Sequence, residues 1–276
     1  AALVVNSGTV NVNASETVGS LAGTGGSVAI DSGITLTTGG DNSSTSYAGT
    51  ISGTGALTKT GTGTFTLTGA NSYEGLTSVN AGVLNVQDAD ALGTDDAGTT
   101  VASGAALEVQ GGITIATEAL TLNGSGVLSG GALRSVSGAN SYDGITTIKN
   151  GTTGILAAKN AAGVGSMVVE IGATLGLRGG ISAVNNITVG GTGVGGLGAI
   201  RNLTGDNTLT GKAILSADTL IDVANGTKLT WTGVIDDGAA TYGVSLQGTG
   251  NLVLTGNNLF NGKTVIAPLT TLTLGA

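Results

Sequence analysis

One short motif recurs four times in the chain and limits the folds that the chain can adopt. In each copy a glycine stands two positions before an asparagine, a large apolar residue follows two positions later, and a second glycine stands two positions beyond it, as in GANSYEG. The positions are Gly69, Asn71, Tyr73, Gly75, Gly138, Asn140, Tyr142, Gly144, Gly205, Asn207, Leu209, Gly211, Gly256, Asn258, Phe260 and Gly262. Successive asparagines are 69, 67 and 51 residues apart, which fits multiples of a unit of roughly 17–25 residues, as in a coil built from strands.

The stretches between the motifs alternate between apolar and polar residues over four or five positions. TFTLT at 64–68, NLVLT at 251–255 and TLTLG at 271–275 each place apolar side chains on one face of a strand. Parallel strands usually need helical connections, but the most helix-like segment, 158–167, is weakened by its glycines. A parallel β-helix removes this conflict, because each strand meets its partner one coil later through turns alone. The sequence therefore predicts an all-β fold, one elongated rod over residues 1–276, about 60 Å long.

The recurring motif is predicted to form a corner of this coil. Its copies place corners near residues 69–79, 138–148, 205–215 and 256–266. Glycine is expected to supply a positive φ where the chain leaves a strand. Asparagine is expected to tolerate the left-handed region and to bond to nearby backbone, and the large apolar residue to cover the corner. The motif is thus predicted to have a structural role and not to be a ligand site.

Composition narrows the possible chemistry. The chain has 276 residues with 52 glycines and 3% aromatic residues, so its core must be built from aliphatic side chains. Nine Lys and Arg stand against 17 Asp and Glu, a net charge of −8, so a basic footprint for nucleic acid is missing. The chain has no cysteine and no histidine, which excludes disulfides, thiolate metal sites and Ser-His-Asp or Cys-His nucleophiles. No cofactor is expected.

The segment LTKTGTGTFTLTGANSYEGLTSVNAGVLNV, residues 57–86, closely resembles the autotransporter-associated β-strand repeat, also called the passenger-associated transport repeat. Residues 131–144 and 198–211 resemble a variant form of it, and residues 248–275 resemble another full copy. The resemblance implies a right-handed parallel β-helix, or β-solenoid, displayed outside a Gram-negative-type outer membrane. Such passengers commonly serve adhesion, aggregation or biofilm formation. The chain shows neither a signal peptide nor a membrane barrel, so membrane attachment is expected only through segments outside it.

Two pairs of neighbouring acids are candidates for catalysis. Asp95-Asp96 and Asp236-Asp237 have the residue types with which polysaccharide-cleaving β-helix enzymes divide acid and base work. Both pairs lie in glycine-rich turns, where aspartate is favoured for local hydrogen bonds. The turn is the preferred interpretation.

The densest group of acids lies in DADALGTDD, residues 88–96. Asp88, Asp90, Asp95 and Asp96 supply the oxygen ligands that calcium prefers. The nonapeptide repeats of calcium-binding β-rolls are not found in the chain. A solvated loop is the preferred interpretation, and no metal site is predicted.

A Gly-x-Gly-x-x-Gly match occurs at Gly191, Gly193 and Gly196. A dinucleotide site needs a helix after these glycines, whereas the sequence that follows them is typical of a strand and a turn. In a chain so rich in glycine, such a match is expected by chance.

Two arginines stand at equivalent positions in two copies of the motif. Arg134 and Arg201 occupy places held by Phe65 and Leu252 in other copies, so we expect the strand to shift or to expose that position. Arginine is expected to bond free carbonyl groups at the corner. Trp231 is predicted to lie in a strand on an undetermined face, and an exposed tryptophan would indicate stacking on carbohydrate.

Three functions remain in competition at the level of sequence. The leading one is a non-enzymatic, surface-displayed structural or adhesive β-helix whose partners are cell-surface or matrix glycans or proteins. The second is a self-assembling extracellular filament, because both ends of the sequence read as strand without a cap, and its partners would be copies of itself. The third is an enzyme that cleaves polysaccharides.

Overall fold

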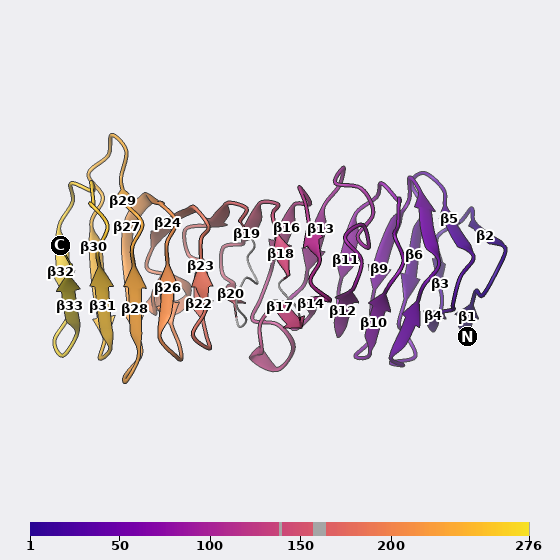
Figure 1. Cartoon of the computed structure of the whole chain (residues 1–276), viewed down its shortest axis with the longest axis horizontal. Coiled ribbons are helices and arrows are strands. Elements are labelled where there is room, and N and C mark those ends of the chain that lie inside the picture. Colours follow the sequence, from indigo (N-terminus) through magenta and orange to yellow (C-terminus); the bar gives the residue numbers. More distant parts are fainter. Residues whose placement is uncertain (138–139, 157–163, 276) are drawn as a thin grey trace.

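The chain winds into a stack of short parallel strands, a solenoid of about 13 turns (Figure 1). The computed structural model describes residues 1–137, 140–156 and 164–275. The N-terminus lies at one end of the stack and the C-terminus at the other. With strands about 4.8 Å apart, 13 turns give a rod of about 60 Å. The predicted all-β fold with a parallel β-solenoid is confirmed.

The first face of the solenoid is one long ladder of strands. Its members are β3 (Glu16–Thr17), β6 (Thr35–Thr38), β9 (Ala56–Lys59), β11 (Thr77–Val79), β13 (Thr99–Val101), β16 (Leu120–Leu122), β19 (Thr146–Ile148), β21 (Met167–Val169), β24 (Ile187–Gly191), the start of β27 (Ala213–Val223) and β29 (Ile235–Asp236). Each strand pairs in parallel with the strand of the next coil.

The second face is built in the same way. It consists of β7 (Thr45–Tyr47), β10 (Thr64–Leu67), β12 (Val83–Val86), β14 (Ala106–Gln110), β17 (Leu133–Ser137), β20 (Thr153–Leu156), β22 (Thr174–Leu177), β25 (Ile200–Asn202), the end of β27, β30 (Val244–Gly248) and β32 (Thr264–Ile266). Most partners in these two ladders are 19–26 residues apart, which is one coil.

The third face is interrupted and carries the first three copies of the corner motif, whereas the fourth copy stacks on β29 of the first face. The ladders of the third face are β2 (Thr9–Val12), β5 (Ser27–Ile30) and β8 (Thr50–Gly53), then β15 (Thr114–Ile115) with β18 (Ser141–Tyr142), and finally β23 (Ser182–Ala183), β26 (Asn207–Leu209), β28 (Lys228–Trp231), β31 (Asn251–Leu254) and β33 (Thr271–Leu274). The remaining pair, β1 (Ala2–Val4) with β4 (Ser20–Ala22), continues the second face, because Gly23 after β4 bridges to Tyr47 in β7. Among the described residues, the helical pieces are two 3-10 turns, η1 (Val127–Ser129) and η2 (Val194–Gly196). Of the helix-like segment 158–167, residues 158–163 lie outside the described part, and β21 begins at Met167.

The core is a set of aliphatic columns that run along the rod. On the first face one column consists of Val79, Val101, Leu122, Ile148 and Val169, each paired with the next and all buried. Each such side chain contributes about 1.5–3 kcal/mol when it leaves water. Single strands of three or four residues bury little, so the stacking of equal neighbours stabilises the fold.

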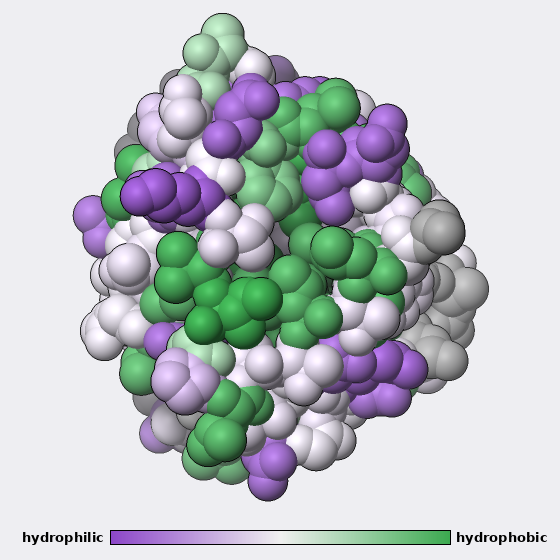
Figure 2. Space-filling view, turned by 90° about the vertical axis from the view of Figure 1, so that its left-hand side faces the viewer, coloured by the Kyte–Doolittle hydropathy of each residue, from purple (hydrophilic) through white to green (hydrophobic). Residues whose placement is uncertain are grey.

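The last coil lacks a neighbour on one side and exposes apolar side chains. Figure 2 looks at this C-terminal end and shows a hydrophobic patch across its centre. A cavity of about 480 Å³ opens there, lined among others by Leu254, Phe260 and Leu272. The side chains of Ile266 and Leu274 are 48% and 71% exposed. This face is apolar because the inner columns of the solenoid end on it.

Candidate functional site

The asparagines of the corner motif link successive coils. In every copy the side-chain Oδ1 accepts a hydrogen bond from the backbone N–H of an isoleucine in the preceding coil. The pairs are Asn71 with Ile51 at 2.8 Å, Asn140 with Ile113 at 3.1 Å, Asn207 with Ile181 at 2.7 Å and Asn258 with Ile235 at 2.9 Å. Asn71 also donates from Nδ2 to the Ala91 carbonyl of the following coil, 2.6 Å away. These amides satisfy backbone groups that no strand ladder reaches.

The glycines of the motif allow close approach between coils, which differs from the expected reason. Among those described, only Gly205 has a positive φ, at 75°, and Gly138 lies outside the described residues. None of the four asparagines has a positive φ. A Cβ on the second glycine of any copy would overlap backbone of the preceding coil, as at Gly144 against the Glu118 carbonyl. The expectation of positive φ was wrong for most of these glycines because stacking against the preceding coil, and not the turn itself, excludes a side chain.

The large apolar residue of the motif points inward in each copy. Tyr73, Tyr142 and Leu209 are buried, while Phe260, in the last coil, is partly buried and packs against the core. The Tyr73 hydroxyl forms a hydrogen bond with Thr77 Oγ1 at 2.5 Å. These contacts are the ones expected where the chain turns a corner of the coil. That the motif has no role beyond this structural one stays a prediction.

Both arginines lie on the outer surface of strands and pair with acids of a neighbouring coil. Arg134 in β17 stands opposite Glu108 in β14, with Nη2 2.6 Å from Oε1. Arg201 in β25 stands opposite Asp222 in β27, with Nε 3.1 Å from Oδ2. The expectation that they bond corner carbonyls is therefore wrong, because each guanidinium has a carboxylate beside it one coil away.

The alignment that placed Arg134 where Phe65 stands was one residue out of register. Along the second face Phe65 pairs with Leu84, Leu84 with Leu107, and Leu107 with Leu133. Leu133 thus takes the buried position, and the arginine that follows it faces outward. Side chains of neighbouring residues in a strand point to opposite faces, so one residue of shift reverses the interpretation.

Two further sequence candidates are explained by the fold. Trp231 is buried in β28, and its Nε1 donates to the Gly211 carbonyl at 3.0 Å, so it offers no exposed ring for carbohydrate stacking. Gly193 and Gly196 flank and end the turn η2, and β25 follows. The helix that a dinucleotide site requires is not formed after these glycines.

The acid pair Asp236-Asp237 is engaged in holding backbone and a lysine. Asp237 is buried, and its Oδ2 accepts from the N–H of Tyr242 at 3.1 Å and from the N–H of Asn261 at 2.9 Å. Asp236 lies 2.8 Å from Lys212 Nζ, and this contact lowers the pKa of its carboxyl. Both carboxylates therefore bind neighbouring backbone and lysine groups, as the turn interpretation expects.

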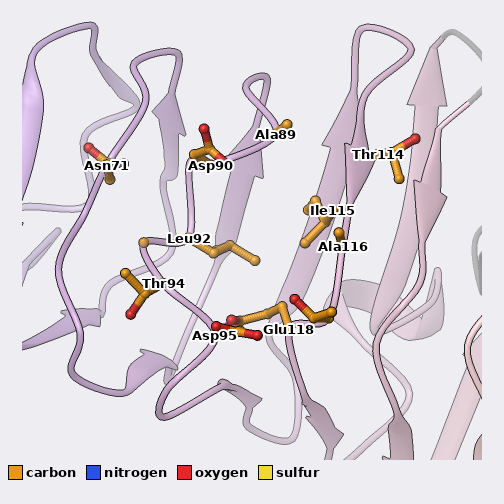
Figure 3. A pocket seen from close by; sticks show the side chains of 12 residues that line it. Asn71, Ala89, Asp90, Leu92, Thr94, Asp95, Thr114, Ile115, Ala116 and Glu118 are labelled. Carbon is orange, nitrogen blue, oxygen red and sulfur yellow. The ribbon is translucent and has the colours of Figure 1, made fainter.

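The other acidic stretch lines a slot between two coils. Residues 89–95 and 114–118 face each other across a cavity of about 450 Å³, and Asn71, in the coil behind residues 89–95, also contributes to its lining (Figure 3). Asp90, Asp95 and Glu118 line it, whereas Asp88 and Asp96 do not. Among the described residues, no three acids come together in a way that would hold a metal ion, so the four aspartates considered as calcium ligands do not form a cluster.

Glu118 is the most unusual residue of this slot. Its side chain is 3% exposed, Thr99 Oγ1 donates to its Oε1 at 2.7 Å, and Figure 3 shows it reaching toward Asp95. Burial, and to a smaller extent the charge of Asp95, raise the pKa of this carboxyl to about 7. Thr117 before it has a φ of 56°, a conformation that non-glycine residues rarely adopt.

Lys59 is a second buried charged residue that the motif search did not find. It is 1% exposed, and its Nζ donates to the carbonyls of Thr60 at 2.6 Å, Gly61 at 2.9 Å and Ala81 at 3.2 Å. Burial lowers the pKa of this amine to about 8. Lys59 pairs with Val79 in an inner column of the first face. Its aliphatic stem therefore continues the column, and its amine ends on the three carbonyls.

Comparison with known proteins agrees with the fold. The family model of the passenger-associated transport repeat matches residues 57–86 and 246–267. The chain is 31% identical over 261 residues to the Adhesin BmaC autotransporter of Brucella suis biovar 1 (strain 1330). That alignment covers 87% of this chain but 7% of the relative, so the chain spans a small part of the length of the curated relative. No solved structure matches the chain.

The parallel solenoid with its repeated corners places the chain in the class of parallel β-helix proteins. Within this class the chain belongs with the autotransporter passengers that carry passenger-associated transport repeats. It is accordingly a surface-exposed or outer-membrane-associated protein of a Gram-negative-type bacterium. Within the described part of the chain, no helix has the length and apolar character needed to cross a bilayer.

Proposed function

We propose that the chain is a non-enzymatic, adhesive segment of a surface-displayed passenger. Its partners would be glycans or proteins of cell surfaces or of the extracellular matrix, and its role would be adhesion, with aggregation or biofilm formation as consequences. The observation that carries this proposal is the solenoid itself, together with its likeness to a protein named as an adhesin.

The mechanism would be geometric. A stiff rod repeats outward-facing polar side chains at every coil, for example Thr100 and Thr121, which pair on the first face. Neighbouring coils place such groups about 4.8 Å apart. Many weak contacts of this kind give strength through avidity, without one deep pocket. The use of Asp236 and Asp237 in local structure also supports a role other than catalysis.

Adhesion of coated beads to host cells or matrix tests this proposal. Deleting residues 167–186 removes one coil and keeps the register, because Met167 pairs with Ile187. We expect each coil deletion to weaken adhesion gradually, and single outward Thr→Ala substitutions to have little effect. A single such substitution that abolished adhesion would contradict the avidity mechanism. Glycan cleavage by the purified chain would contradict its non-enzymatic nature.

A further inference from the structure

The slot beside Glu118 exists because one rung of the third face is missing. Residues 89–95 stack only on the coil before them, where Asn71 N–H donates to the Asp90 carbonyl at 3.0 Å and Thr94 N–H donates to the Tyr73 carbonyl at 3.0 Å. In the described structure no hydrogen bond joins residues 88–98 to residues 111–118. The two segments are instead separated by the cavity of about 450 Å³, within the range of about 300–1,000 Å³ typical of ligand pockets.

The missing rung leaves the edge of β15 open toward the slot. The carbonyls of Ile113 and Ile115 accept from the next coil, from the N–H groups of Ser141 and Asp143. Residues of a parallel strand alternate in the neighbour to which they bond. The N–H and C=O of Thr114, between the two isoleucines, therefore point the other way, toward the slot. Such an edge offers the backbone hydrogen bonds that an added strand would use.

The slot is also acidic without a compensating cation. Asp90, Asp95 and Glu118 line it, and no lysine or arginine is among its lining residues. Thr99 supplies the hydrogen bond to Oε1 of Glu118, whereas Oε2 accepts none from the described residues. Glu118 as a residue is only 3% exposed, so water screens its charge weakly, and a cation placed beside it and Asp95 would be stabilised by both carboxylates.

We propose that this slot binds a short extended segment of a partner polypeptide that carries a basic side chain. The lysine or arginine pairs with Asp95 and Glu118, while the backbone of the segment adds to the edge of β15. The open edge selects a polypeptide as the occupant, and the two carboxylates select its charge. This inference deepens the proposed adhesive function, on which it rests for its biological setting, by naming one contact and its chemistry.

Binding of three small probes to the purified chain tests the proposal. The blocked tripeptide Ac-Thr-Lys-Thr-NH2 has both the backbone and the charge, its acetyl-lysine analogue lacks the charge, and n-butylammonium lacks the backbone. We expect the first to bind in the millimolar range or tighter and to shift the amide NMR signals of Thr114 and Ala116. Each of the other two should bind at least about tenfold more weakly.

Variants with matched loss of charge separate the slot from general acidity. D95N/E118Q keeps the shape of both side chains, and its dissociation constant for the lysine tripeptide should rise at least about tenfold. D88N/D96N, at acids of the same loop outside the slot, should stay within about twofold of the wild type. Circular dichroism and amide dispersion check that both variants remain folded.

The proposal is overturned if the tripeptide fails to bind at millimolar concentration, or if D95N/E118Q binds it as the wild type does. It is also overturned if butylammonium binds as tightly as the tripeptide, since the slot would then be a site for small cations. Because no cells are involved, slot binding and bead adhesion fail independently. Adhesion without slot binding would reject this inference alone, and slot binding without adhesion would reject the adhesive function alone.

Discussion

At the scale of single residues, the corner asparagines do what strand ladders do elsewhere in the coil. Asn71 is 5% exposed and joins three coils through Ile51 and Ala91. Removing it leaves one N–H and one C=O buried without a partner, at about 1–3 kcal/mol for each group. We therefore expect Asn71→Ala to lower the free energy of unfolding by about 2–5 kcal/mol, measured by urea denaturation.

Two other asparagines serve as controls for that substitution. Asn258 makes one such bond in the more open last coil, so Asn258→Ala should cost less than Asn71→Ala. Asn11 is exposed in β2, and Asn11→Ala should change stability by no more than about 0.5 kcal/mol. Equal losses for Asn71 and Asn11 would show that the bridging bonds do not stabilise the coil.

Glu118 makes stability depend on pH in a direction opposite to that of most paired acids. Its pKa is raised from 4.5 to about 7, so the folded chain holds a proton that the unfolded chain releases. Its contribution to stability is fully present below about pH 4.5, falls between pH 4.5 and 7, and is level above pH 7. Asp90 and Asp95 of the slot and the buried hydroxyls of Tyr73 and Tyr142 surround it.

Glu118→Gln should remove that part of the pH dependence. Glutamine keeps the size of the side chain and can accept from Thr99, but it has no charge to bury. The wild type should therefore lose stability relative to E118Q between pH 4.5 and 7, by about 1–3 kcal/mol as for a buried group left without its partners. Urea denaturation of both proteins at several pH values measures the difference. A difference that is constant over this interval would contradict the raised pKa.

Part of this residue-level pattern was open to prediction from the sequence. Lys59 and Glu118 stand two positions from Leu57 and Leu120, so strict alternation places both side chains on the inner face. Alternation alone does not carry this assignment, because a charged side chain is not expected inside a core. What the sequence does not contain is the set of three carbonyls that receives Lys59, or the φ of 56° at Thr117, since both arise from the stacking of separate coils.

At the scale of the element, the corner is defined by contact between coils more than by its own turn. The repeated spacing predicts where the corners lie, whereas the contact between coils that explains their glycines is not visible in the sequence. Positive φ is a property of one segment, but the overlap of a Cβ with the preceding coil depends on a neighbour about 20 residues away. For the same reason the sequence alignment missed the one-residue register that separates Leu133 from Arg134.

This explanation predicts how alanine acts at two kinds of glycine. At Gly211 a Cβ would overlap the Asn185 carbonyl, so Gly211→Ala should separate two coils and lower the free energy of unfolding by about 2–4 kcal/mol. At Gly40 no atom lies within 4 Å of the added carbon and φ is not positive, so Gly40→Ala should be neutral or slightly stabilising. Thermal denaturation compares the two variants. A tolerant Gly211 would show that coil spacing does not require glycine there.

At the scale of the whole molecule, each coil is stabilised mainly by the two coils that contact it. A stack of this kind has stability that is the sum of local terms and nearest-neighbour terms, so damage should spread over a limited distance. Val189 tests this, because it lies buried in the inner column of the first face between Val169 and Leu215. Val189→Asp places an unpaired charge in the core, which the neighbouring coils cannot satisfy.

Hydrogen exchange read by mass spectrometry follows the extent of the damage along the rod. In V189D we expect amides of β21, β24 and the start of β27 to exchange much faster than in the wild type, with smaller changes one coil further on. Amides of β5 and β8, several coils away, should keep their protection. Each coil contacts only its neighbours, so the damage has to pass through every coil in between. Thr188→Ala, at the neighbouring and more exposed position, serves as the control and should change little. Uniform loss of protection along the whole chain in V189D would show that the rod unfolds as one cooperative unit, and a stack governed by neighbours would then be the wrong physical description.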